Sequence, residues 1–66
     1  MTTVKGADVQ PGQVIKYRGR WYEIQSIWHQ EPAYRVASGW QAHTGRGRGI
    51  GSMILGNAEA YPVRTN

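Results

Sequence analysis

Arginine and tryptophan are the residues of this chain whose types and spacing could carry chemistry. Six of the eight basic residues are arginines, and the chain holds three tryptophans and four tyrosines but no phenylalanine. Arginine makes paired hydrogen bonds to phosphate and stacks on bases, while tryptophan and tyrosine combine an apolar ring with a polar end that tolerates partial exposure. This set is typical of a polyanion-binding surface, and equally of a small barrel whose open ends are covered by aromatic rings.

The segment HTGRGRGIGS, residues 43–52, places Arg46 and Arg48 between alternating glycines and shows neither a helical period nor strand alternation. It is not a phosphate-binding P-loop, because the Lys-Ser/Thr pair and the following helix are missing. The spacing instead predicts a finger whose cations follow a phosphate backbone, as Arg-Gly segments of RNA-binding proteins do. The alternative is an ordinary hairpin loop with solvated arginines.

A second basic turn, Arg18-Gly19-Arg20, repeats this chemistry earlier in the chain. If the fold brings both basic segments to one side, their arginines form a single patch with two tryptophans beside it, available for base stacking. The predicted nucleic-acid-binding residues are Arg18, Arg20, Trp21, Trp40, Arg46 and Arg48. The same surface would suit an acidic protein partner.

Residues that could catalyse a reaction or hold a metal are few. The chain has no cysteine, two histidines and four acidic residues. His29 and His43 lie in expected loops, and only Glu31 stands close to one of them. No nucleophile with its base and no metal-ligand cluster is present in the pattern. We therefore expect no enzymatic activity, no cofactor and no metal.

Length and charge limit the class of protein. With 66 residues, a formal charge of +4 and a pI near 10.0, the chain is one small basic domain that attracts polyanions. The lack of cysteine, of an N-terminal apolar run and of a stretch of about 20 apolar residues predicts a cytoplasmic protein without a membrane span. Seven large aromatic side chains in so short a chain also predict an apolar patch and a possible homodimer.

Nine glycines and three prolines interrupt a chain without helical periodicity, which predicts an all-β fold. Met1–Gln10 is expected to be a partly ordered arm, and residues 11–66 a small five-stranded SH3-like barrel. The expected strands are Gln13–Tyr17, Trp21–Trp28, Ala33–Ala37, Ser52–Leu55 and Tyr61–Arg64, with a short helical turn or loop at Gly56–Ala60. The expected core is Val14, Ile24, Ile27, Val36, Ile54, Leu55 and Val63, with some of the tyrosines.

The stretch ADVQPGQVIKYRGRWYEIQSI, residues 7–27, resembles the start of the N-terminal domain of elongation factor P and its relatives, an SH3-like barrel of the KOW kind. The shared features are a Pro-Gly turn, a Val-Ile strand, a charged glycine turn and an aromatic-rich return strand. The resemblance implies binding to RNA or to RNA-bound machinery. The lysine that this family carries at the tip of the next hairpin has no counterpart in HQEPAY, residues 29–34.

YRVASGWQAH, residues 34–43, and AYPVRTN, residues 60–66, are similar to segments of the plasmid-encoded type II dihydrofolate reductases. These are short SH3-like chains that form an active site only at the centre of a tetramer, so the resemblance implies an oligomer-assembled reductase. Tyr61-Pro62-Val63 matches that family, whereas NAEAYPV, residues 57–63, lacks the family's glutamine.

Residues and resemblance together favour a small module that binds RNA or single-stranded DNA through backbone contacts and aromatic stacking, with little sequence readout. The alternative is a protein-interaction module, for example a phage-type accessory regulator that docks on a larger host complex. The reductase is the third hypothesis.

Overall fold

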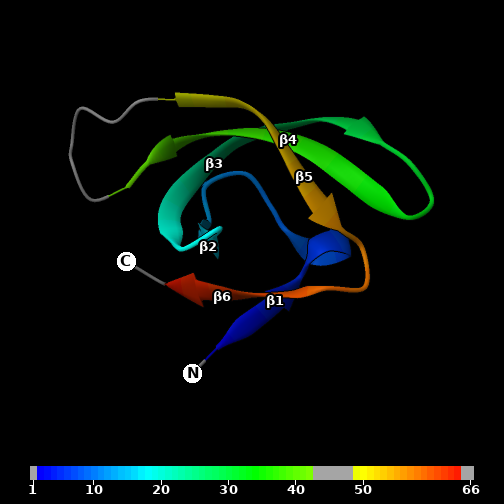
Figure 1. Cartoon of the computed structure of the whole chain (residues 1–66), viewed down its shortest axis with the longest axis horizontal. Coiled ribbons are helices and arrows are strands. Elements are labelled where there is room, and N and C mark those ends of the chain that lie inside the picture. Colours follow the sequence, from blue (N-terminus) through cyan, green and yellow to red (C-terminus); the bar gives the residue numbers. More distant parts are fainter. Residues whose placement is uncertain (1, 43–48, 65–66) are drawn as a thin grey trace.

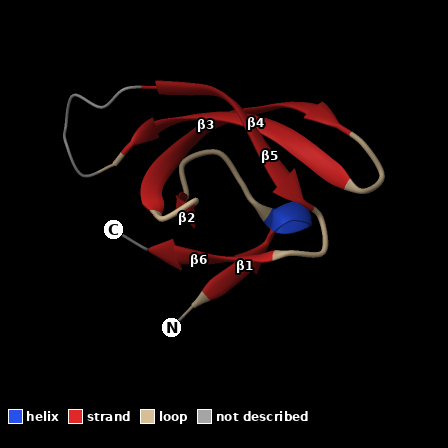
Figure 2. Cartoon of the chain, viewed as in Figure 1, coloured by secondary structure: helices blue, strands red, loops and turns tan. Residues whose placement is uncertain are grey.

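A computed structural model describes residues 2–42 and 49–64 and shows a chain built almost entirely from β-strands (Figure 2). The elements are β1 Thr3–Lys5, the 3₁₀ turn η1 Gly6–Asp8, β2 Val14–Tyr17, β3 Arg20–Gln30, β4 Tyr34–Gln41, β5 Gly49–Gly56 and β6 Ala60–Arg64. They form one antiparallel sheet in the order β1-β6-β2-β3-β4-β5, which backbone pairing does not close. The all-β prediction is confirmed, but there are six strands where the sequence predicts five. No helix in the described residues is long and apolar enough to cross a membrane.

The first hairpin is the part of the fold that the sequence specifies most directly. β2 pairs antiparallel with β3, with Tyr17 opposite Arg20, so the turn consists of Arg18 and Gly19 alone. Both turn residues have positive φ, 51° at Arg18 and 83° at Gly19, as a type I′ turn requires. The predicted pairing of Trp21–Trp28 with Gln13–Tyr17 is confirmed.

The sheet bends over itself and encloses the core on its inner face. Figure 1 shows β3, β4 and β5 in one layer and β6 with β1 in the other, joined through β2. Two register shifts in the β3–β4 ladder and one in the β4–β5 ladder mark the bulges that accompany this bend. The buried inner cluster consists of Val9, Ile15, Tyr17, Ile24, Ala37, Met53 and Leu55.

The core prediction is wrong at one position in β5. Ile54 is 57% exposed, while its neighbours Met53 and Leu55 are fully buried. Successive side chains of a strand point to opposite faces, so Ile54 and Leu55 cannot both enter the same core. The bulge in the β4–β5 ladder sets which of the two points inward.

The N-terminal segment carries structure where the sequence predicts only a partly ordered arm. β1 pairs with β6, and η1 lies beside the end of β5 (Figure 1). Val9 is fully buried in the core. The Nη1 atom of Arg35 donates to the carbonyl oxygens of Gly6 at 2.8 Å and Val9 at 3.1 Å. Together these contacts hold β1 against β6, and η1 and Val9 against β4 and β5.

Pro62 lies in an interior strand, whereas proline within a sheet is usually confined to an edge strand. β6 runs between β1 and β2. The amide of Val63 donates to the carbonyl of Thr2 on the β1 side, so the missing N–H of Pro62 faces β2. The β2–β6 ladder contains only the pairs formed by Val63 and Arg64, and it therefore loses no hydrogen bond at the proline.

Two tyrosine hydroxyls bridge the open side of the sheet between β5 and strands β2 and β6. The Tyr17 hydroxyl accepts a hydrogen bond from the amide of Ile54 at 3.3 Å, and the Tyr61 hydroxyl accepts one from Gly56 at 3.0 Å. Tyr61 in turn donates to Oε2 of Glu59 at 3.0 Å. These bonds satisfy β5 amides that have no neighbouring strand.

Tyr61 should make the fold sensitive to alkali. Burial is the main cause that raises the pKa of this hydroxyl above 10.0. The folded chain therefore keeps a proton that the unfolded chain releases near pH 10, and the free energy of unfolding should fall as the pH rises above that value. We expect Tyr61→Phe to flatten this fall and to cost about 0.5–1.5 kcal/mol at neutral pH. Urea unfolding at pH 8 and pH 10.5 measures both effects.

Tyr34→Phe is the control for this prediction, because the Tyr34 ring lies on the exposed surface. An identical alkaline loss of stability in the parent and in Tyr61→Phe would show that the Tyr61 hydroxyl is not the titrating group.

Candidate functional site

The outer face of the sheet brings the predicted tryptophans together. Lys16 lies opposite Trp21 in the β2–β3 ladder. Glu23, two residues after Trp21 on β3, lies opposite Trp40 in the β3–β4 ladder. Directly opposite residues share a face, so Trp21 and Trp40 occupy diagonal positions on the outer side. Arg64 joins them from β6, since it pairs with Val14, which in turn lies opposite Glu23. We call Lys16, Trp21, Glu23, Trp40 and Arg64 the tryptophan face.

Two cations lie against the Trp21 ring. The guanidinium carbon of Arg64 lies 5.0 Å from the ring centroid, and Nζ of Lys16 lies 6.0 Å from it. Cations at this distance are attracted by the ring quadrupole, more strongly where water is excluded. Neither residue is among those that the sequence predicts for the site. Strand alternation could have found Lys16, whereas Arg64 is brought there by β6, which is distant in sequence.

The Trp40 side chain is 45% exposed at the end of β4. Its ring lies against Gly49, the residue opposite it on β5, where an added Cβ would lie 3.4 Å from Cζ3 of Trp40. A glycine beneath an aromatic ring lets the ring lie close to the neighbouring strand. One side of Trp40 is therefore covered by its own sheet, and the indole keeps an exposed surface for stacking.

Arg18 and Arg20 lie at the first hairpin, on the inner side of the sheet and at its rim. Arg20 lies opposite Tyr17, a core residue, so it belongs to the inner side of the hairpin. The guanidinium carbon of Arg18 lies 5.6 Å from the centroid of the same Tyr17 ring. Both arginines are exposed at the rim of the sheet, beside the tryptophan face rather than on it.

Arg46 and Arg48, the two cations of the glycine-arginine segment, lie outside the described residues. The described chain stops at Ala42, whose amide donates to the carbonyl of Trp21, and resumes at Gly49, opposite Trp40. Both ends of the segment are therefore fixed next to the two tryptophans.

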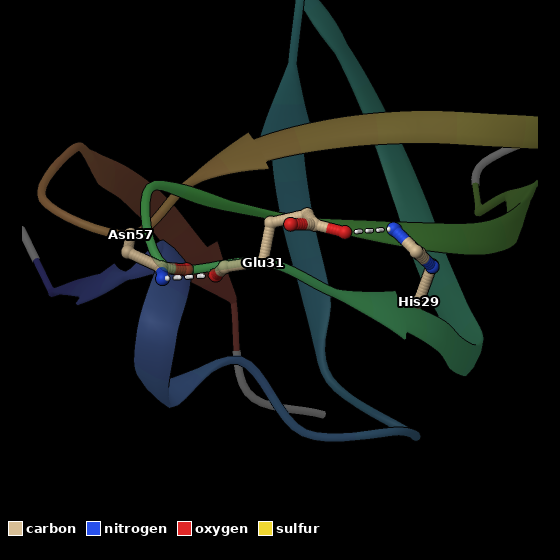
Figure 3. A network of polar contacts seen from close by, with 3 residues as sticks. All are labelled: His29, Glu31 and Asn57. Atoms are coloured by element: carbon tan, nitrogen blue, oxygen red, sulfur yellow. Dashed lines mark hydrogen bonds and ion pairs between the residues drawn. The ribbon is translucent and has the colours of Figure 1, made fainter.

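A polar network occupies the opposite end of the sheet, at the β3–β4 turn (Figure 3). Nε2 of His29 and Oε2 of Glu31 lie 2.6 Å apart on the exposed surface. Asn57 donates through Nδ2 to the carbonyls of Glu31 and Pro32 at 3.2 and 3.0 Å. This network anchors the β5–β6 turn to the β3–β4 turn. Across residues 2–42 and 49–64, no group of three or more His, Cys, Asp and Glu side chains could hold a metal ion.

The charge on the tryptophan face is mixed. Lys16 and Arg64 contribute two positive charges, and the exposed carboxylate of Glu23 lies between the two tryptophans. Arg18 and Arg20 add two more positive charges at the rim. An extended polyanion with flat rings could place its charges near the cations and its rings on the indoles, while Glu23 would oppose phosphate directly above it.

Fold and face together define a small all-β protein with an exposed surface of aromatic rings and cations. No family model, no curated protein and no solved structure matches this chain. The resemblance of residues 7–27 to the elongation factor P domain and that of residues 34–43 and 60–66 to the type II reductases remain expectations from sequence.

Proposed function

We propose that this protein is a small basic module that binds single-stranded nucleic acid, RNA or DNA, on the tryptophan face. The observation that carries the proposal is the diagonal placement of Trp21 and Trp40 on one face, with Lys16 and Arg64 beside the Trp21 ring. Single-strand binders combine stacking rings with cations that follow the backbone, and they read little sequence.

Each cation has a defined part in this proposal. Arg64 and Lys16 contact phosphates, and when Arg64 turns from the Trp21 ring to a phosphate it frees that ring for a base. Arg18 and Arg20 at the rim, with Arg46 and Arg48 from the glycine-arginine segment, extend the positive potential along the strand. Trp40 stacks the neighbouring base.

The backbone of the Arg18-Gly19 turn gives separate support for a role of Arg18. A non-glycine residue with φ of 51° carries a conformational cost that asparagine or glycine would reduce. Residues held in such conformations concentrate at functional sites. Phosphate binding by Arg18 at the rim explains why this position holds an arginine in spite of its conformational cost.

The same proposal includes the finer description of the fold as an SH3-like barrel. The bent sheet and the two tyrosine hydroxyls that bridge β5 to β2 and β6 support it. In such a barrel the tryptophan face lies on the outer surface, where an extended strand can cross β2, β3 and β4.

A pair of charge changes on neighbouring strands tests the function. Lys16→Gln should weaken binding to a single-stranded oligonucleotide and lower the slope of log affinity against log salt by about 0.7–1. Glu23→Gln should tighten binding, because it removes the carboxylate that opposes phosphate. Intrinsic tryptophan fluorescence, titrated with single-stranded and duplex oligonucleotides at several salt concentrations, measures both.

The opposite effects expected of Lys16→Gln and Glu23→Gln on affinity are the control, since a variant that was merely destabilised could not bind more tightly. Arg18→Asn provides a further check, because it should reduce binding while leaving stability equal or higher. No binding at low salt, or unchanged affinity in both the Lys16 and the Glu23 variants, would remove the tryptophan face from nucleic-acid recognition.

A further inference from the structure

A second exposed surface lies on the outer face at the other end of β4. Trp28, Tyr34, Val36 and Ile54 lie on this side of β3, β4 and β5, and we call them the apolar face. Val36 itself is buried, so Trp28, Tyr34 and Ile54 supply the exposed area. Trp28 and Ile54 are each 57% exposed, and β5 is an edge strand of the sheet. An exposed group of large apolar side chains on a small protein marks a surface that contacts a partner.

The indole N–H of the apolar face is already satisfied within the chain. The indole nitrogen of Trp28 donates to the carbonyl of Gly51 at 3.2 Å, so the side chain reaches across β4 to β5. His29 and Glu31, at the margin, pair with each other. A partner therefore needs to satisfy only the hydroxyl of Tyr34, or to leave it at the solvated margin, and it gains by covering apolar area.

The charge distribution selects the partner. Among the described residues of this part of the outer face none is Lys or Arg, because the one arginine of β4, Arg35, points inward to Gly6 and Val9. The face thus offers nothing to phosphate or to an acidic protein. A second copy presents an apolar surface of the same kind, with the cations of both chains away from the contact.

We propose that two copies of this chain pair through the apolar face as a symmetric dimer. Two-fold pairing sets one patch against the same patch on the other copy, and the outer faces of the two sheets stack as in a sandwich, about 10 Å apart.

The exposed area predicts a weak dimer. Aromatic side chains bury about 150–250 Å² each, so the exposed parts of Trp28, Tyr34 and Ile54 amount to roughly 300 Å² per copy. Even with flanking atoms, the total stays below the roughly 1,200 Å² of stable interfaces, so a weak dimer that forms only at high protein concentration is expected.

Sedimentation equilibrium of the full chain between about 10 μM and 1 mM tests the proposal without nucleic acid. The mass should rise from the 7.4 kDa of the monomer toward twice that value, and added salt should strengthen association, because it screens repulsion between two chains of charge +4. Ile54→Lys should weaken association at least tenfold, since it places a charge in the apolar contact.

Thr3→Lys is the matched control, because it adds the same charge on an exposed residue of β1, at the far edge of the sheet. It should associate like the parent. Ile54→Thr keeps a β-branched side chain and should weaken association several-fold, which keeps the test decisive if the lysine variant folds poorly. A parent chain that stays at 7.4 kDa at 1 mM, or an Ile54→Lys variant that associates like the parent, would overturn the proposal.

Discussion

Gly6→Ala is expected to lower the free energy of unfolding by about 3 kcal/mol or more. A Cβ at this position would lie 2.1 Å from the carbonyl oxygen of Gly56 and 2.8 Å from its carbonyl carbon, both backbone atoms. Neither can move aside without breaking the contact between η1 and the end of β5. A domain of this size has only about 3–10 kcal/mol of stability in total, so one backbone clash removes a large part of it.

Urea unfolding followed by tryptophan fluorescence measures the loss, and Gly51→Ala is the matched control. Gly51 lies in β5 with no neighbouring atom within 4 Å of an added Cβ, so its alanine variant should keep the parent midpoint. A Gly6→Ala variant with the parent midpoint would contradict the placement of η1 against β5.

Gly6 also shows why the sequence predicts the N-terminal segment poorly. Its backbone contacts come from Glu59 and Gly56, and its carbonyl oxygen is held by Arg35. All three partners are distant in the chain, and no local pattern of residues signals them. Val9 is likewise buried by elements that fold around it. Local propensity describes such a segment as an arm, and only tertiary contacts make it part of the sheet.

Local pattern performs better where strand and turn chemistry agree. The β2–β3 hairpin has β-branched and aromatic residues on both sides of the Arg18-Gly19 turn, so local chemistry alone fixes its pairing. In β5 three apolar residues, Met53, Ile54 and Leu55, follow one another, so the strand can be recognised but the phase of its alternation depends on a bulge opposite Ala37 and Gly39. A sequence shows that a segment is a strand more readily than it shows which of its side chains face the core. Ile54 is wrongly predicted as a core residue for this reason.

The same distinction applies to the tryptophan face. The sequence indicates Trp21 and Trp40 as stacking residues, and the register places them on one face. Proximity along the chain wrongly groups Arg20 with its neighbour Trp21, because adjacent strand residues point to opposite sides. Lys16 and Arg64 reach the Trp21 ring from other strands, and Arg64 could be found only from the complete strand order.

The stacking part of the proposed function gives the largest expected change in binding. Replacing both Trp21 and Trp40 by alanine should weaken single-strand binding by roughly 10²–10⁴-fold, because stacking contributes about 1–3 kcal/mol per base. The slope of log affinity against log salt should stay the same, because neither change removes a cation. Anisotropy of a labelled oligonucleotide is the suitable measurement, since it does not depend on the tryptophans that are removed.

Trp28→Ala is the matched control for the stacking prediction. Trp28 is 57% exposed, compared with 45% for Trp40, but it belongs to the apolar face at the opposite end of β4. The change should leave nucleic-acid affinity within about twofold of the parent, measured below the concentration at which the chain associates. Trp40→Ala should by itself account for about 1–3 kcal/mol of the loss, because Trp40 keeps an exposed ring surface for stacking on one base. Equal losses from Trp28→Ala and Trp40→Ala would mean that the bound strand does not distinguish the two ends of the outer face. In that case stacking would have to be assigned to exposed indoles in general and not to the tryptophan face.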